Sequence, residues 1–113
     1  MDIQYDPNLV VDCANGSGGL LASKVAKRIQ SYLTVTIVND KDIGVRLNHD
    51  CGSDFVLKSK REPMSLNPKM PNRVACFDGD AQRLVYIQRI KNKPPKILDG
   101  DKQFGLIMHY IKL

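Results

Sequence analysis

Two carboxylates and an arginine lie close together in residues 78–83 (DGDAQR), directly after a short apolar segment. Asp78 and Asp80 flank a glycine, and acidic side chains at alternate positions of a turn place oxygens around one point, as a hard divalent cation requires. Arg83 follows, where a guanidinium can bind a phosphate whose other oxygens contact the metal. A metal, an arginine and a phosphate together indicate phosphoryl transfer.

Other interpretations of residues 78–83 remain open at this point. The segment begins like an EF-hand calcium loop, but Arg83 stands where that loop needs glycine and Arg89 where it needs glutamate. A turn whose carboxylates accept hydrogen bonds from local amides also explains the pattern. Residues 99–101 repeat the tripeptide before a predicted helix, where capping is a sufficient role. The basic run 58–61 (KSKR) either adds phosphate contacts or forms a solvated loop.

A glycine cluster, residues 16–19 (GSGG), is the second candidate site. Gly16 and Gly18 match the first two glycines of a dinucleotide-binding turn, and Asp40 lies at about the distance expected of a ribose-binding carboxylate. Leu21 stands where the third glycine belongs. A small nucleotide-binding or interaction module using the Gly16–Gly19 turn is therefore the alternative function. The simpler interpretation is that the glycines turn the chain into a helix.

The histidines and cysteines point to no site of their own. His49, beside Asp50 and Cys51, lacks a second ligand pair, so we expect a local structural role. His109 lies on the predicted last helix and is expected at the surface or facing a partner. The three cysteines, at positions 13, 51 and 76, form no Cys-x-x-Cys pair, so neither a disulfide framework nor a zinc site is predicted.

The elements that would position these residues begin with a βαβ unit. Segments 9–14 and 34–38 have strand chemistry. Between them, residues 20–33 predict a helix whose apolar side chains recur every four positions, at Leu21, Val25, Ile29 and Leu33. Residues 40–73 are predicted to be loops around a short helix near 53–58.

The second half of the chain predicts strands at 74–77 and 84–87, then a turn over 91–95 that contains Pro94 and Pro95. A strand near 97–98 should complete a hairpin. A helix after residue 101 carries two apolar stripes, formed by Phe104, Ile107, Met108 and Ile111 and by Leu106, Tyr110 and Leu113. Because this helix is apolar over most of its circumference, we expect more chain, or a partner, to cover it.

Length and composition limit the class of protein. The 113 residues, 42% of them hydrophobic, predict a single domain with a modest core. The net charge of +5 favours anionic ligands, but the basic run has no interleaved aromatic residues, so no nucleic-acid partner is predicted. The sequence predicts no membrane span and no signal peptide, hence a cytoplasmic chain without a membrane partner.

Four segments, residues 11–16, 47–56, 77–83 and 98–102, resemble the α-D-phosphohexomutases, and within them the phosphoacetylglucosamine mutases. Order and spacing agree from about residue 9 to the end. The resemblance implies an α/β fold, a single phosphohexomutase-type domain with a mixed four-stranded sheet sandwiched between two helices. Residues 9–113 would form the second, metal-loop domain, after an N-terminal extension of residues 1–8. The implied reaction interconverts N-acetylglucosamine 6-phosphate and 1-phosphate through a bisphosphate, in UDP-N-acetylglucosamine biosynthesis.

The resemblance also implies roles for four residues. Asp78, Asp80 and Gln82 would bind Mg²⁺ against phosphoserine oxygens, and Arg83 would act catalytically by contacting that phosphate. The family pattern has a third aspartate at position 82, so we expect Gln82 to weaken magnesium binding.

A second departure lies at Leu57, which stands where the family has a lysine. Lys58 comes one residue later, and that offset rotates a helical side chain by about 100°. The phosphoserine, the sugar-reading loop and the loop that binds the substrate phosphate have no counterpart among the 113 residues. The implied partners are therefore a phosphosugar and a phosphoserine-bearing domain, and we expect the chain, whether fragment, truncated product or degenerate relative, to be inactive alone.

Overall fold

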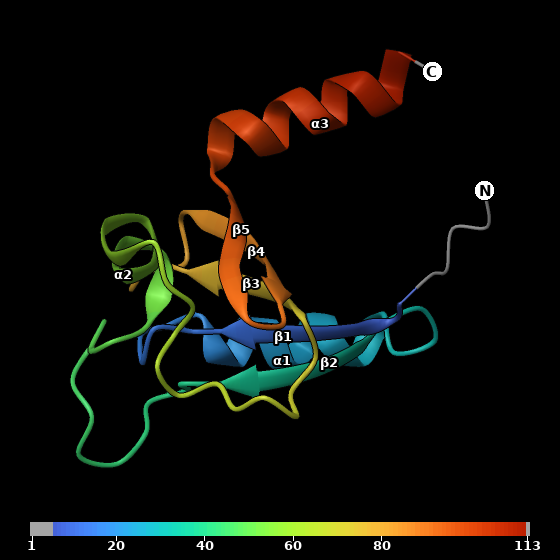
Figure 1. Ribbon diagram of the computed structural model, residues 1–113. Helices are drawn as coiled ribbons and strands as arrows, with labels where there is room; N and C mark the ends of the chain where they lie inside the picture. Colours follow the sequence, from blue (N-terminus) through green and yellow to red (C-terminus); the bar gives the residue numbers. More distant parts are fainter. Residues whose placement is uncertain (1–5, 113) are drawn as a thin grey trace.

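The computed structural model describes residues 6–112 and contains one mixed sheet with helices on both faces (Figure 1). The strand order is β2-β1-β3-β4-β5, in which β1 pairs in parallel with β2 and β3 while β3, β4 and β5 pair antiparallel. The elements are β1 (Asn8–Asp12), α1 (Gly19–Arg28), β2 (Thr34–Val38), α2 (Gly52–Ser59), β3 (Arg73–Phe77), β4 (Leu84–Ile90), β5 (Lys93–Leu98) and α3 (Gly100–Lys112). The predicted mixed α/β architecture is confirmed, but the described chain has five strands rather than four.

Only the family resemblance implied four strands, since the residue patterns predicted five segments. Strand β5 begins earlier than the strand predicted near residues 97–98. Pro94 and Pro95 belong to this edge strand and not to the turn, because an edge strand needs backbone donors on one side only. Both fall where the pairing between β4 and β5 shifts its register. The turn itself is only Lys91 and Asn92, and Asn92 adopts a φ of 61°. The hairpin is confirmed, but the predicted turn over 91–95 is too long.

Helices α1 and α2 cover opposite faces of the sheet, as the sandwich predicted. Alternate side chains of β1 point to the two faces, so Val10 packs in one core cluster with Val56 of α2 and Val11 packs in another with Ala22 of α1. Each face of the central strands therefore has its own small apolar layer.

Helix α1 is shorter than predicted and buries a different face. It ends at Arg28, because residues 29–32 form a turn that leads the chain back into β2. The predicted apolar stripe is partly in solvent, with Leu21 64% and Val25 47% exposed. Helical periodicity in the sequence thus continued past the point where the chain must reverse.

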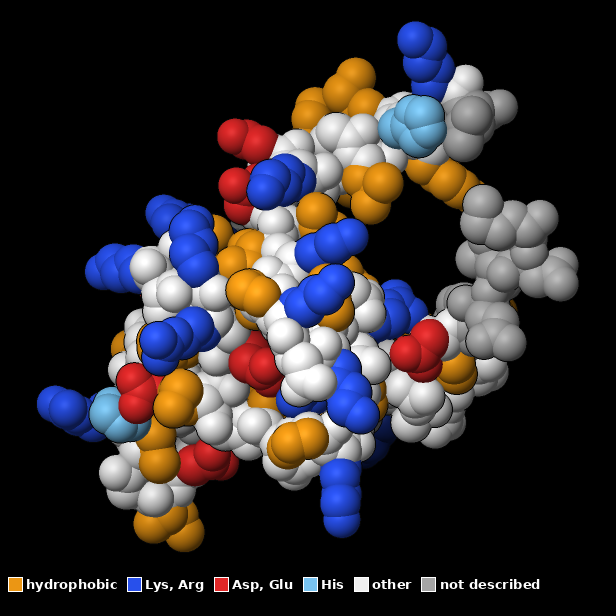
Figure 2. All heavy atoms as spheres, in the orientation of Figure 1, with side chains coloured by type: hydrophobic (Ala, Val, Ile, Leu, Met, Phe, Trp, Pro, Cys, Tyr) orange, Lys and Arg blue, Asp and Glu red, His pale blue; other side chains and the backbone are white. Residues whose placement is uncertain are grey.

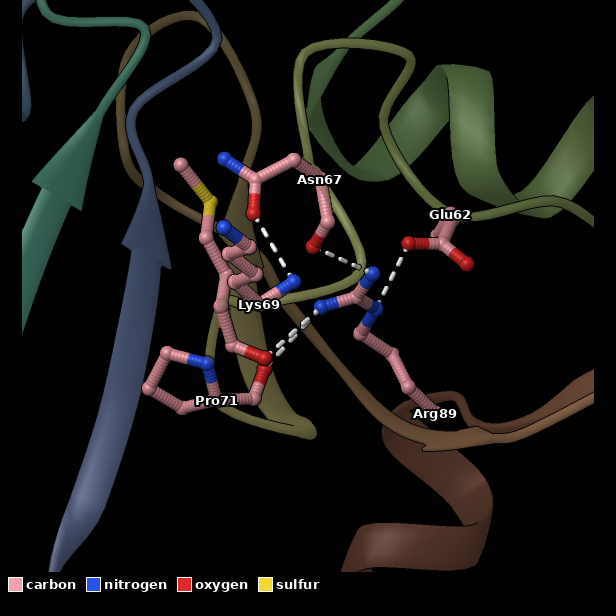
Figure 3. Close-up of polar contacts among 6 residues, drawn as sticks. Glu62, Asn67, Lys69, Pro71 and Arg89 are labelled. Atoms are coloured by element: carbon pink, nitrogen blue, oxygen red, sulfur yellow. Dashed lines mark hydrogen bonds and ion pairs between the residues drawn. The ribbon is translucent and has the colours of Figure 1, made fainter.

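The long loop between α2 and β3 is attached to the sheet by Arg89 (Figure 3). The Arg89 Nε atom lies 2.6 Å from a Glu62 carboxylate oxygen, and the guanidinium donates to the carbonyls of Asn67, Met70 and Pro71 at 2.8–3.3 Å. One side chain therefore makes an ion pair and three hydrogen bonds along the loop. The prediction of loops around a short helix in this region is confirmed.

Helix α3 stands away from the sheet and carries hydrophobic side chains on several sides (Figures 1 and 2). Its six large apolar residues from Phe104 to Ile111 are 55–77% exposed. Leu113, predicted on one apolar stripe, lies outside the described residues. Within residues 6–112, no helix combines the length and apolar character needed to cross a membrane.

Candidate metal-binding site

The loop formed by residues 78–83 follows β3, next to the turn formed by residues 13–18 after β1. Parallel pairing places Asp12 opposite Cys76, so the carboxyl ends of both strands meet at the same edge of the sheet. The two connections are therefore neighbours, although more than 60 residues separate Ser17 from Gly79. We call residues 78–83 the metal loop and residues 13–18 the β1 turn.

Asp78 organises the metal loop. One of its carboxylate oxygens accepts hydrogen bonds from the backbone N–H groups of Gln82 at 2.8 Å and Arg83 at 3.0 Å. The backbone of Asp78 also closes the loop, because its carbonyl accepts from Ala81 and its N–H donates to Arg83. Ala81 has a φ of 57°, in the left-handed region. Asp80, Gln82 and Arg83 remain exposed at the loop surface.

The hydrogen bonds also affect the charge on Asp78. Its partial desolvation by itself would raise the pKa of Asp78, but hydrogen bonds, first from the Arg83 and Gln82 amides and then from the Asp80 side chain, lower the pKa below its usual range. A carboxylate stabilised in its ionised form is ready to bind a cation at neutral pH.

The donor chemistry of the metal loop suits Mg²⁺. Asp78 and Asp80 offer carboxylate oxygens and Gln82 offers an amide carbonyl oxygen, and hard cations prefer such ligands. Among residues 6–112, no group of three or more histidine, cysteine or acidic side chains is arranged to hold a metal. A cation at this loop would therefore meet two carboxylates, those of Asp78 and Asp80, and the neutral amide oxygen of Gln82.

The β1 turn packs directly against the metal loop. Ser17 N–H donates to the carbonyl of Gly79 at 2.9 Å. A Cβ on Gly16 would overlap the Gly79 carbonyl and come within 2.7 Å of its carbonyl carbon, so only glycine allows this approach of two backbones. Gly16 thus has a packing role, which neither sequence interpretation of the glycine cluster predicted.

The start of α1 is also filled by the protein itself. A Cβ on Gly19 would overlap the Asp40 carboxylate, so this acidic side chain lies against the first turn of the helix. A carboxylate at that place repels the phosphate that a nucleotide would put there. These contacts give no support to a nucleotide site at the Gly16–Gly19 turn.

Asp12 is a structural residue that the sequence did not single out. Its fully buried carboxylate accepts hydrogen bonds from Ala14 N–H at 2.9 Å, from the Asn39 side chain at 2.9 Å and from Gly52 N–H at 2.6 Å. It thereby joins the β1 turn, the end of β2 and the start of α2. The available signal was an acidic residue inside an otherwise apolar strand.

The three cysteines are free and buried beside Asp12. Burial first, and then the nearby carboxylates of Asp40 and Asp12, raises the pKa of Cys13 to about 11. Burial and Asp12 raise the pKa of Cys51 to about 12 and raise that of Cys76 as well. Protonated thiols are poor nucleophiles, so we assign these cysteines a structural role in the core rather than a reactive one.

The remaining candidates lie apart from the metal loop. The His49 Nε2 atom lies 3.4 Å from a carboxylate oxygen of Asp50, and its backbone N–H donates to the Arg46 carbonyl, both consistent with a local role. Leu57 packs against the core, whereas Lys58 is exposed. No hydrogen bond or ion pair joins the basic run 58–61 to the metal loop in the described part of the chain. His109 is exposed on α3, as expected.

Comparison with known proteins gives one consistent result. The profile of the family described as phosphoacetylglucosamine mutase AMG1, domain II, matches residues 3–85. The human phosphoacetylglucosamine mutase is 38% identical over 105 residues, which cover 93% of this chain and 19% of the human protein. The rice enzyme is 41% identical over 108 residues, which cover 92% of this chain and 19% of the enzyme.

Solved structures agree with these sequence matches. A crystal structure of an N-acetylglucosamine-phosphate mutase of the α-D-phosphohexomutase superfamily, in its substrate complex, superposes with a TM-score of 0.82 at 31% identity and covers 95% of this chain and 20% of its own. The Aspergillus fumigatus N-acetylphosphoglucosamine mutase in complex with GlcNAc-6P and magnesium gives a TM-score of 0.72 at 36% identity, over 85% of this chain and 20% of its own. The chain spans about one fifth of the length of these relatives. Because family profile, sequence identity and fold agree over most of its length, the chain belongs to the phosphoacetylglucosamine mutase family, in which it corresponds to domain II.

Proposed function

We propose that this chain supplies the magnesium-binding loop of a phosphoacetylglucosamine mutase, which interconverts N-acetylglucosamine 6-phosphate and 1-phosphate in the cytoplasm for UDP-N-acetylglucosamine synthesis. The observation that carries the proposal is the Asp78 carboxylate, held in place by two backbone amides in a loop of oxygen donors. The reaction is inferred from family membership. The contribution of this domain, binding of Mg²⁺, is inferred from the loop at residues 78–83.

The roles of the loop residues follow from their chemistry. Asp78 and Asp80 would bind Mg²⁺ through carboxylate oxygens, and Gln82 through its side-chain carbonyl. When bound, the ion offsets negative charge on the phosphoryl oxygens during transfer. Arg83, exposed at the end of the loop, would donate to the phosphate of a phosphoserine on another domain.

The other steps need parts that lie outside these 113 residues. Relatives that carry the whole reaction are about five times longer, since this chain covers 19% of the human and rice enzymes. Phosphosugar binding and the phosphoserine are assigned to the other domains. We therefore expect no mutase turnover by this chain alone with magnesium and a hexose bisphosphate. Substantial turnover would refute the assignment of phosphosugar binding and the phosphoserine to other domains.

Magnesium titration of the chain tests the proposal directly. MgCl₂ should shift the backbone NMR signals of residues 78–83 in a saturable way, and the double substitution Asp78→Asn, Asp80→Asn should abolish the effect. The second Asp-Gly-Asp provides a matched control, because Asp99→Asn with Asp101→Asn removes the same charges at the start of α3. Equal loss of binding in both double variants, or no saturable shift in the unmodified chain, would contradict a specific site at the loop.

A further inference from the structure

The contacts inside the metal loop and those that hold it in place come from different residues. Within the loop, Asp78 accepts from Gln82 and Arg83, and Asp78 and Ala81 close the backbone. These bonds set the shape of the loop but not its position relative to the sheet. Three of the residues that would contact ligand, Asp80, Gln82 and Arg83, are exposed and so receive little support from packing.

External support comes from the β1 turn. Ser17 N–H donates to Gly79 O at 2.9 Å, and Gly16 lies so close that no side chain fits between the two backbones. Gly18 faces the other end of the loop, where an added Cβ would lie 3.0 Å from the Ala81 Cβ and 3.4 Å from the Phe77 ring. On a further side, Leu47 lies 3.0 Å from the position of a Cβ on Gly79.

The β1 turn is itself anchored. Asn15 N–H donates to Asn39 O at 2.7 Å, and Ala14 O accepts from Asn48 N–H at 2.8 Å. Ala14 and Asn15 have φ values of 57° and 54°, a conformation that persists only when the surroundings determine it. The β1 turn therefore has a fixed position relative to the sheet, and the metal loop packs against it.

We propose that Gly16 and Ser17 are positioning residues for the magnesium loop: their backbone contacts with Gly79 hold Asp78, Asp80, Gln82 and Arg83 where a metal and a phosphate can be bound together. This inference rests on the proposed function, since it assigns the support of the same site. Groups that orient metal ligands typically change metal affinity by about 10- to 100-fold when they are removed.

A graded series of glycine-to-alanine substitutions tests the proposal, because each adds one methyl group at a different distance from the loop. Gly16→Ala would overlap the Gly79 backbone, Gly18→Ala would press on Ala81, and Gly105→Ala on α3 meets no atom within 4 Å. The first should weaken Mg²⁺ binding by about tenfold. The second should produce a smaller loss, and the third none.

The measurements are MgCl₂ titration by NMR and hydrogen exchange of the Gln82 and Arg83 amides, with circular dichroism to confirm the fold. Faster exchange at these two amides in folded Gly16→Ala, with β4 unchanged, supports positioning. A folded Gly16→Ala chain with the exchange and affinity of the Gly105→Ala control would overturn it. If Gly16→Ala fails to fold, Gly18→Ala decides on the same criteria.

The exchange readout separates the two proposals. If the unmodified chain shows no saturable magnesium shift, the proposed metal function fails. Faster exchange at Gln82 and Arg83 in Gly16→Ala would then still establish that the β1 turn holds the loop. Weaker magnesium binding with unchanged exchange would instead overturn the positioning role while leaving the metal function intact.

Discussion

Gln82 distinguishes this metal loop from the aspartate-rich pattern that the family resemblance implies. Asp78 is held by two amides and needs no further help to stay ionised, whereas Gln82 brings a neutral oxygen to a site with only two carboxylates. The affinity of a hard cation depends on the number of charged ligands. If the proposed magnesium site is correct, position 82 would therefore set its affinity.

Replacing Gln82 with aspartate should strengthen magnesium binding by about tenfold, equivalent to ~1.4 kcal/mol, because it restores a third charged oxygen ligand. The measurement is the dissociation constant for MgCl₂ from the NMR titration. Gln30→Asp adds the same charge at an exposed position outside the loop and controls for general electrostatics. An equal gain in both variants would show that net charge, and not ligation at position 82, controls binding.

The long loop between α2 and β3 is held to the sheet by side-chain contacts. The loop between α2 and β3 packs Leu66 and Met70 against the core and is tied further by Arg89, which contacts Glu62 and three backbone carbonyls (Figure 3). The guanidinium side chain is only 10% exposed, so these hydrogen bonds lie largely out of water. Their loss would leave several acceptors without a donor.

Arg89→Met should therefore lower the free energy of unfolding by about 2 kcal/mol, since removing a donor from partly buried, charge-assisted hydrogen bonds leaves its partners unsatisfied. Urea denaturation measures the change, and hydrogen exchange should localise it to residues 62–72. Lys91→Met removes an exposed cation two residues later and should have almost no effect. A similar loss of stability in both variants would mean that the loop does not depend on the Arg89 contacts.

The molecule as a whole combines a core that contains three buried thiols with a helix, α3, whose apolar side chains are exposed. The three buried thiols surround the Asp12 carboxylate, which ties three connections together. Helix α3, in contrast, exposes six large apolar side chains, a larger apolar surface than solvent favours for a single helix. The prediction that further chain or a partner covers this helix stays a prediction.

The buried thiols make stability sensitive to alkaline pH. Their pKa values in the folded chain are raised, to about 11 for Cys13 and about 12 for Cys51, so the folded state keeps protons that the unfolded chain loses near pH 9. This contribution is fully present below about pH 9 and is lost as the pH rises toward 11. Urea denaturation from pH 8 to 10.5 should show the decline.

Cys13→Ala provides the control for the alkaline decline, because lysine and tyrosine side chains titrate in the same range. The variant removes one thiol and should flatten the decline relative to the unmodified chain, although a small cavity lowers its stability at every pH. Identical slopes in the two chains would show that Cys13 does not contribute. A thiol reagent at neutral pH should modify the cysteines only after unfolding.

The sequence alone determined the element types, the βαβ start, the hairpin and the loop at residues 78–83, because hydrophobic periodicity and short polar motifs are local properties. It did not determine where α1 ends, which side of α1 is buried, or that Pro94 and Pro95 lie in an edge strand, since those depend on what each segment packs against. The apposition of Gly16 and Gly79 and the three bonds to Asp12 were also decided only by the tertiary structure. Parallel pairing of β1 with β3 brings those distant residues to one edge of the sheet, and no local pattern records that contact.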